Sequence, residues 1–250
     1  MKLGTALTIF LLAIVPFTAH ADKKKKPLAL KVTPATTGLP LVTLTASDEP
    51  LGEIADRLAK QLGTTVNASA AARASHVTLD LDEQPLDLAL RQLAPQAYLD
   101  GILSGGAAGK LEIQAIHLSM AGEPAPSLNE LKKRSSEAIM FAGDTEDSGV
   151  DPLAGKLEVS YENERLRVFA KQQPLWDVAS KLADALRIPL ELIGDPRESI
   201  DVSVSDATLE QTMRALSPSV KLYQRTDLAT LRTTPVRIAV REPFSMRPNP

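Results

Sequence analysis

Residues 50–66 read PLGEIADRLAKQLGTTV, and their spacing predicts a helix that leads into a short strand. Pro50 suits the first turn of a helix, where its missing N–H costs nothing. Gly63 favours the left-handed conformation that commonly ends a helix. Apolar residues recur at intervals of three and four, which places them on one helix face. These residues are Leu51, Ile54, Ala55, Leu58 and Leu62.

Strand patterns surround this helix on both sides. Apolar and polar residues alternate in several short segments, as they do in half-buried strands. Pro85 opens a second helix, whose apolar face extends to Leu93. The strands are predicted at 28–33, 42–45, 64–67, 77–81, 97–103 and 111–117. Residues 28–118 therefore follow the order β-β-α-β-β-α-β-β.

The same order of elements returns about 124 positions later, where Pro174 takes the place of Pro50. Positions that are apolar in the first copy are apolar again in the second. The matching residues of the second copy are Leu166, Val168, Leu175, Val178, Ala179, Leu182, Leu186, Ile200, Val202, Val204, Leu209, Met213, Leu216, Val236, Ile238 and Val240. Element order, helix length and apolar positions agree together, so the sequence predicts a duplication.

These patterns predict an α+β protein of two tandem small modules, each a mixed β-sheet covered by two helices. The expected division is a signal peptide (1–21), a basic stub (22–27), a first domain (28–118), an acidic linker (119–155), a second domain (156–241) and a disordered tail (242–250). The linker is expected to be open, with a short helix within 128–141. Cleavage in it is expected to release two stable domains.

Residues 50–66, the strand VTLDL at 77–81 and the helix QPLDLALRQL at 84–93 resemble the secretin and TonB short N-terminal (STN) domain. The resemblance covers nearly all of 41–118 and, more weakly, 157–241, where Arg187-Ile188-Pro189 stands in place of the glycine turn. It implies a periplasmic domain of the kind found in outer-membrane secretins and signalling TonB-dependent receptors, where such domains dock other proteins. It carries over a docking role rather than a place in one particular machine.

The amino terminus has the layout of a signal peptide. A positive start at Lys2 precedes an apolar run over 7–17, and the small residues Ala19 and Ala21 flank His20. The run is shorter than a permanent membrane-spanning helix needs, which makes an uncleaved anchor the weaker alternative. We therefore expect cleavage after Ala21 and a periplasmic protein, with association to the outer membrane as a further expectation.

The composition of the remaining chain excludes several classes of protein. Without Lys2, 27 basic and 31 acidic side chains leave a net charge of −4, which is no electrostatic footprint for nucleic acid. The chain has no cysteine, so neither disulfides nor a lipid-modified amino-terminal cysteine is expected. We expect no integral membrane segment after signal cleavage, because no later stretch is long and apolar enough.

Residues that could carry chemistry are few and do not form known arrangements. His76 and His117 are interpreted as surface or edge-strand residues, because their spacing fits no zinc motif. The loop GGAAGK at 105–110 lacks the features of a phosphate loop and predicts a flexible hairpin loop. The stretch 144–155 resembles a calcium loop, but Gly155 stands where a glutamate is required. We predict no catalytic residue, no cofactor and no metal, and a protein that is not an enzyme.

Two functions remain open after this exclusion. The first is a periplasmic protein-interaction module, an accessory of an outer-membrane secretin or TonB-dependent assembly. The alternative is a ligand- or cell-wall-binding protein, or an enzyme, with a site between the two repeats. Matched polar residues in both copies would favour such a shared site, and Arg91 and Arg214 on the second helices are one match. A solvated helix face explains this match better than a shared anion site does, and we keep both arginines as candidate protein-binding residues.

Trp176 is the third candidate for binding a protein partner. It is the only tryptophan, and it lies off the apolar stripe of its predicted helix, where the first copy has Gly52. Tryptophan is enriched among interface residues that contribute most to affinity. The alternative is that its ring packs over Tyr161 or Phe141 and covers the second domain.

The signal peptide gives the first testable prediction. Because Ala19-His20-Ala21 has the small residues that signal peptidase requires, the mature protein should begin at Asp22. Amino-terminal sequencing of protein recovered from the periplasm checks this. A mature chain that still begins at Met1 would contradict it.

Overall fold

The computed structural model describes residues 27–35, 38–107, 109–133, 156–194 and 198–241. Helices and strands occur together in both halves of the chain, which confirms the mixed α and β class. The predicted signal peptide (1–21), most of the basic stub, residues 134–155 of the predicted linker and the predicted tail (242–250) lie outside the described residues. Within the described ranges, the helices are all too short or too polar to cross a membrane.

The chain has two halves with the same order of strands. The first half contains β1 (Ala29–Thr33), β2 (Leu41–Pro50), α1 (Leu51–Leu62), β3 (Thr65–Ala68), α2 (Ala70–Ala74), β4 (His76–Pro85), α3 (Leu86–Leu93), β5 (Gln96–Ser104) and β6 (Leu111–Ser119). After α4 (Asn129–Lys132), the second half contains β7 (Leu157–Glu162), β8 (Arg165–Pro174), α5 (Leu175–Leu186), β9 (Leu190–Ile193), β10 (Ser199–Ala207), α6 (Leu209–Ala215), β11 (Val220–Asp227) and β12 (Arg232–Arg241). The short helix α2 lies between β3 and β4, where the sequence analysis places no helix, and the Ser69 side chain caps it by accepting the N–H of Ala72.

Local sequence explains where the long helices begin and end. Pro50 and Pro174 end a strand and directly precede α1 and α5. Gly63 ends α1 with a left-handed φ of 65°, as predicted. Arg187, where the sequence departs from the glycine pattern, takes the same conformation with φ 56° and ends α5. The departure therefore changes the residue but not the turn.

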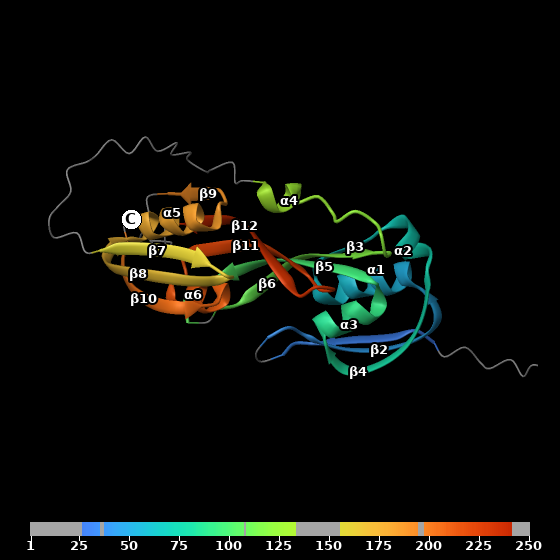
Figure 1. Ribbon diagram of the computed structural model, residues 1–250. Coiled ribbons are helices and arrows are strands. Elements are labelled where there is room, and N and C mark those ends of the chain that lie inside the picture. Colours follow the sequence, from blue (N-terminus) through green and yellow to red (C-terminus); the bar gives the residue numbers. More distant parts are fainter. Residues whose placement is uncertain (1–26, 36–37, 108, 134–155, 195–197, 242–250) are drawn as a thin grey trace, which may run out of the picture.

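The strands of the described residues form three sheets, whose arrangement can be followed in Figure 1. Two are three-stranded, with the orders β1-β2-β4 and β10-β8-β7, and the third is six-stranded, with the order β3-β6-β5-β11-β12-β9. This differs from the predicted single sheet per module. Helix α1 contacts β2 of a three-stranded sheet and β3 of the six-stranded sheet, and α5 likewise contacts β8 and β12. Each helix thus packs between two sheets, because its apolar face is wide enough to serve both.

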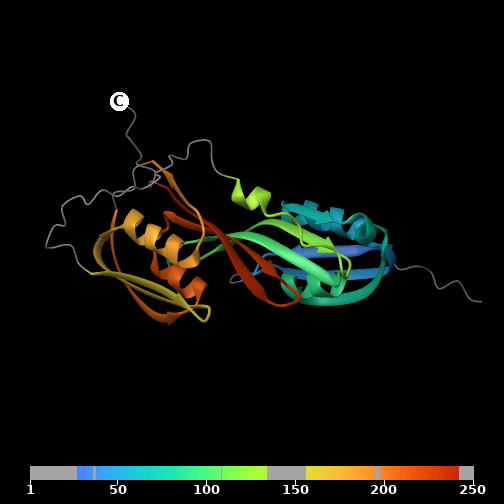
Figure 2. The ribbon, with the colours of Figure 1, turned by 45° about the horizontal axis from the view of Figure 1, so that its top comes forward.

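One continuous sheet joins the two halves. Strand β5 pairs antiparallel with β11, from Tyr98 opposite Asp227 to Ser104 opposite Lys221. In Figure 2 the red hairpin of β11 and β12 extends from the second half toward the first. Its turn residue Leu228 is 2% exposed and belongs to the core of the first half, while Leu103 of β5 belongs to the core of the second. The expectation of separable modules is therefore at odds with the structure, since strand pairing between distant segments leaves no periodic signal in the sequence.

The shared sheet changes what cleavage of the linker should do. If a protease site is inserted within residues 134–155 and cut, the two halves should stay together, because β5–β11 pairing and the exchanged core residues hold them. Size-exclusion chromatography of the cut protein should give one peak at the mass of the intact chain. The same sample in urea should separate into two fragments. Two separate peaks under native conditions would contradict the shared sheet.

Candidate functional site

Trp176 lies in the first turn of α5 and remains 38% exposed. It corresponds to Gly52, the same position in α1, which is buried. A Cβ at Gly52 would lie 3.3 Å from the backbone oxygen of Arg73 in α2, so α2 covers this flank of the first half. In the second half, β9 and β10 are joined by Gly194 to Glu198, a shorter segment than the one that contains α2. Trp176 therefore stands on a helix flank that a neighbouring helix covers in the first half.

Phe169 is a second exposed aromatic residue, which the sequence analysis missed. It lies on β8 and is 39% exposed on the outer face of the sheet formed by β7, β8 and β10. Its counterpart on β2 is Thr45, which donates to Asp80 across the sheet. The alternation of apolar residues along β8 could have predicted the exposure of Phe169. Leu166, Val168 and Ala170 are buried, and the residues between them, including Phe169, point outward.

Arg91 and Arg214 lie on different helices, α3 and α6, and both are exposed. Arg214 Nη2 donates to Glu210 Oε1 at 2.5 Å within its own helix, a surface ion pair that contributes little stability. The Arg214 stem also lies against Gly109, where a Cβ would approach its Cγ to 2.5 Å. Among the described residues, no hydrogen bond or ion pair joins Arg91, Arg214 and Trp176 to one another. The structure therefore gives no direct contact that would unite the three candidates in one site.

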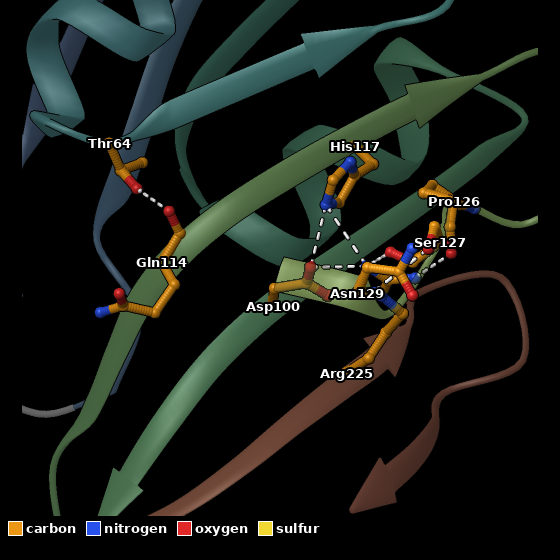
Figure 3. Close-up of polar contacts among 8 residues, drawn as sticks. All are labelled: Thr64, Asp100, Gln114, His117, Pro126, Ser127, Asn129 and Arg225. Carbon is orange, nitrogen blue, oxygen red and sulfur yellow. Dashed lines mark hydrogen bonds and ion pairs between the residues drawn. The ribbon is translucent and has the colours of Figure 1, made fainter. Parts of the chain in front are cut away.

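The most elaborate polar cluster is buried where the two halves meet. Figure 3 shows the carboxylate of Asp100 on β5 between the ring of His117 on β6 and the guanidinium of Arg225 on β11. Arg225 donates to both oxygens of Asp100, and His117 Nε2 lies 2.9 Å from Asp100 Oδ2. The Asp100 and Arg225 side chains are only 4% and 7% exposed. A single carboxylate thus receives donors from both halves.

The same arginine holds the start of the predicted linker. Arg225 donates to the carbonyl oxygens of Pro126 and Ser127, and Arg237 on β12 donates to that of Leu131 at 2.8 Å. Arg237 also pairs with the buried Glu191 on β9, and its guanidinium lies over the ring of Tyr223, 3.5 Å from the centroid. Residues 126–131, here called the strap, are therefore bound to the six-stranded sheet. The predicted open linker differs from the structure over this part.

The electrostatics of the cluster follow from burial and its donors. Burial alone would raise the pKa of the Asp100 carboxyl, but hydrogen bonds from Arg225 and His117 outweigh it and hold that pKa below its ordinary value. Burial raises the pKa of Tyr223, whose ring lies beneath Arg237. The ionised carboxylate at the joint is therefore stable at neutral pH.

The remaining chemical candidates have structural roles. The interpretation of His117 as a surface or edge-strand residue is wrong, because β6 lies inside the sheet and the His117 side chain is 15% exposed. His76 is exposed, with its Nδ1 3.0 Å from Asp48 Oδ1. The loop that begins at Gly105 packs against the second half, since a Cβ at Gly105 would lie 2.1 Å from the Ser217 oxygen. In the described ranges no three His, Asp or Glu side chains gather as metal ligands would.

Asp100→Asn tests the buried joint. The variant leaves the Arg225 charge uncompensated, so we expect a loss of about 3–5 kcal/mol in unfolding free energy at pH 7. Because the folded pKa of Asp100 is below the unfolded value of about 3.9, its contribution is complete above that pH. It is lost as the pH falls through the folded pKa. The difference between wild type and variant should therefore shrink in strong acid, as measured by urea unfolding at each pH.

Asp56→Asn is the matched control for this variant. Asp56 also accepts two hydrogen bonds from one arginine, Arg73, but both side chains are about half exposed. Solvent screens such a pair, so its loss should be much smaller. Equal losses for the two variants would contradict the special role of the buried joint.

Comparisons with known proteins do not assign this chain. No family model, no curated protein and no solved structure matches it. The resemblance to the STN domain therefore rests on the residues of the two repeats alone.

Proposed function

We propose that this chain is a non-enzymatic protein-interaction module of the periplasm, an accessory of an outer-membrane secretin or TonB-dependent assembly. Its two halves are tandem copies of one STN-like domain. The proposal is supported by the signal-peptide pattern, by the recurrence of backbone details in both halves, and by the exposure of large aromatic side chains in the second half.

The recurrence of strained backbone positions supports a duplication. Strands β2 and β4 pair with two register shifts, which contain Asp48 and Glu83 at φ 55° and 43°. Strands β8 and β10 pair with two shifts at the matching places, and there Gln172 and Asp206 have φ 49° and 53°. A positive φ is costly for residues other than glycine. Four such residues at two equivalent places are hard to explain without a common module.

The observation that carries the docking function is the difference between the halves at exposed positions. The second half exposes Trp176 and Phe169, where the first half has Gly52 and Thr45. Exposure of the large apolar surface of an aromatic side chain to water is unfavourable. Such side chains are enriched at the centres of protein interfaces, where they are buried. Because the first half keeps its fold with small residues at these positions, the fold does not require aromatic side chains there. A partner that covers Trp176 and Phe169 explains their presence.

The shared sheet gives such a partner a rigid platform. The pairing of β5 with β11 and the exchanged core residues fix one half relative to the other. Binding to a rigid surface loses less conformational entropy than binding to mobile domains. The alternative function requires a site between the two repeats. That space holds the β5–β11 ladder and the buried side chains of Asp100 and Arg225, which favours docking.

Trp176→Ala tests the proposed docking surface. Since the ring is partly exposed, the variant should lose less than about 1 kcal/mol of unfolding free energy. It should lose about 2 kcal/mol or more of partner binding if the ring is an interface anchor. The measurements are urea unfolding and crosslinking capture from periplasm, with the captured protein identified by mass and its affinity then determined.

Leu88→Ala provides the control, because Leu88 on α3 of the first half is also 38% exposed. Capture of the same partner should be unchanged in this variant. A large loss of stability in Trp176→Ala, with unchanged binding per folded molecule, would make Trp176 a core residue and remove the docking surface.

A further inference from the structure

The outer edge of β1 in the first half is closed by side chains of α1. Gln61 Oε1 accepts the N–H of Val32 at 2.7 Å, and Gln61 Nε2 donates to the oxygen of Leu30 at 2.7 Å. One turn earlier, Arg57 Nη1 donates to the oxygen of Leu28 at 2.9 Å. The amide of Gln61 thus bonds the strand edge as a neighbouring strand would. Such protection is needed because an open edge attracts other strands.

Strand β7 is the counterpart of β1, and the register of both sheets establishes which groups correspond. Val32 lies opposite Val42 and Tyr161 lies opposite Leu166, which are matching positions of β2 and β8. Two residues back, Leu30 and Val159 match in the same way. The N–H and C=O groups of Val159 and Tyr161 therefore point away from β8, as those of Leu30 and Val32 point away from β2.

The second half lacks the side chains that close this edge. Counted from the start of each helix, Ala185 of α5 stands where α1 has Gln61, and Lys181 stands where it has Arg57. Ala185 ends at Cβ and cannot bond the backbone of β7. Across the described residues, no hydrogen bond reaches the outward backbone groups of Val159 and Tyr161. Figure 1 shows β7 at the border of its sheet, beside α5.

The side chains of β7 indicate what kind of strand fits this edge. Glu158, Ser160 and Glu162 point outward and are exposed, while Leu157, Val159 and Tyr161 are partly buried against the core of the second half. A strand added beside β7 continues this alternation. It would cover the partly exposed apolar row with apolar residues and place its other residues beside Glu158 and Glu162. Glu158 already forms an exposed ion pair with Lys156, and Glu162 lies opposite Arg165 of β8, so a basic residue on the added strand would compete with these exposed contacts. Opposite charges in such cross-strand pairs stabilise a sheet, and like charges destabilise it.

We propose that the open edge of β7 binds an extended segment of a partner protein, in which apolar residues alternate with lysine or arginine. The segment adds a fourth strand to the sheet β10-β8-β7. Backbone hydrogen bonds provide the affinity, and the glutamates select the basic partner. This inference rests on the proposed docking function but uses a different surface. Gly52, the counterpart of Trp176, faces α2, whereas Gln61, the counterpart of Ala185, faces β1.

The probe is a seven-residue peptide of alternating valine and lysine, with blocked ends. Added to the mature protein, it should slow hydrogen exchange of the Val159 and Tyr161 amides, measured residue by residue by NMR. The Val32 amide, already bonded to Gln61, should be slow with and without peptide. A peptide of the same sequence with alternate N–H groups methylated keeps the charge but cannot pair, so it controls for attraction of a basic peptide to an acidic protein. It should leave the exchange of the Val159 and Tyr161 amides unchanged.

Ala185→Gln is the deciding variant, because it places on α5 the residue that closes β1 in the first half. It should protect the Tyr161 amide without peptide and weaken peptide binding by about tenfold or more, the equivalent of one to two lost hydrogen bonds. Gln61→Ala is the reciprocal variant and should expose the Val32 amide to exchange.

Three other outcomes overturn the inference, and a fourth counts against the proposed function instead. Unchanged exchange of Val159 and Tyr161 at saturating peptide, or equal peptide affinity of wild type and Ala185→Gln, excludes the edge as the site. Protection that grows with protein concentration in the absence of peptide assigns the edge to a second copy of the chain. If Ala185→Gln keeps the partner captured from periplasm and Trp176→Ala loses it, the proposed function stands and the β7 edge is excluded. If the peptide still binds Trp176→Ala but the wild type captures no partner from periplasm, the β7 edge stands as a peptide-binding site and the proposed function is contradicted.

Discussion

The pairing of β5 with β11 is the constraint on which the rest of this structure depends. It turns two groups of three strands into one six-stranded sheet and places Asp100 directly opposite Arg225. Burial of two charges costs several kcal/mol for each ion unless they are well paired. Here the guanidinium bonds both carboxylate oxygens, and His117 adds a further contact. The joint is therefore specific, because another register would leave both charges buried without partners.

The same joint organises the segment that follows β6. Arg225 and Arg237 come from the second half and donate to backbone oxygens of the strap at 126–131. Each arginine therefore bonds a carboxylate and a carbonyl together, which satisfies several donors of its planar guanidinium. The stacking of Arg237 on Tyr223 further restricts its orientation. Residues 126–131, which follow the last strand of the first half, are therefore bound by two arginines of the second half.

The two halves agree in backbone detail and differ at their surfaces. Both have the same strand pairing, the same left-handed helix ends at Gly63 and Arg187, and bulges at the same places. They differ where Gly52 is replaced by Trp176 and where Gln61 is replaced by Ala185. The first half covers a helix flank and a strand edge with its own atoms. The second half presents the same two features to solvent, which is the physical basis for proposing that it binds a partner.

The amino-acid sequence by itself determined the local elements and the order in which they recur. The apolar spacing of residues 50–66 and 174–186 reports which face of each helix is buried, and the alternation in the strands reports their inner rows. These are short-range signals, because a helix or strand exposes its periodicity within a dozen residues. The sequence also placed Trp176 off the apolar stripe, where the structure has it exposed.

Only the tertiary structure decided how the two halves of the chain are joined. Asp100 is a charged residue in an otherwise apolar strand. Its partner Arg225 lies 125 residues away, and neither segment contains a sequence pattern that identifies the other as its partner. For the same reason the sequence predicts a surface or edge-strand position for His117 and an open linker, and both predictions differ from the structure. A periodic pattern shows that a face is buried, but not what it is buried against. That choice depends on strand pairing, charge compensation and close contacts between distant segments, and these exist only once the chain has folded.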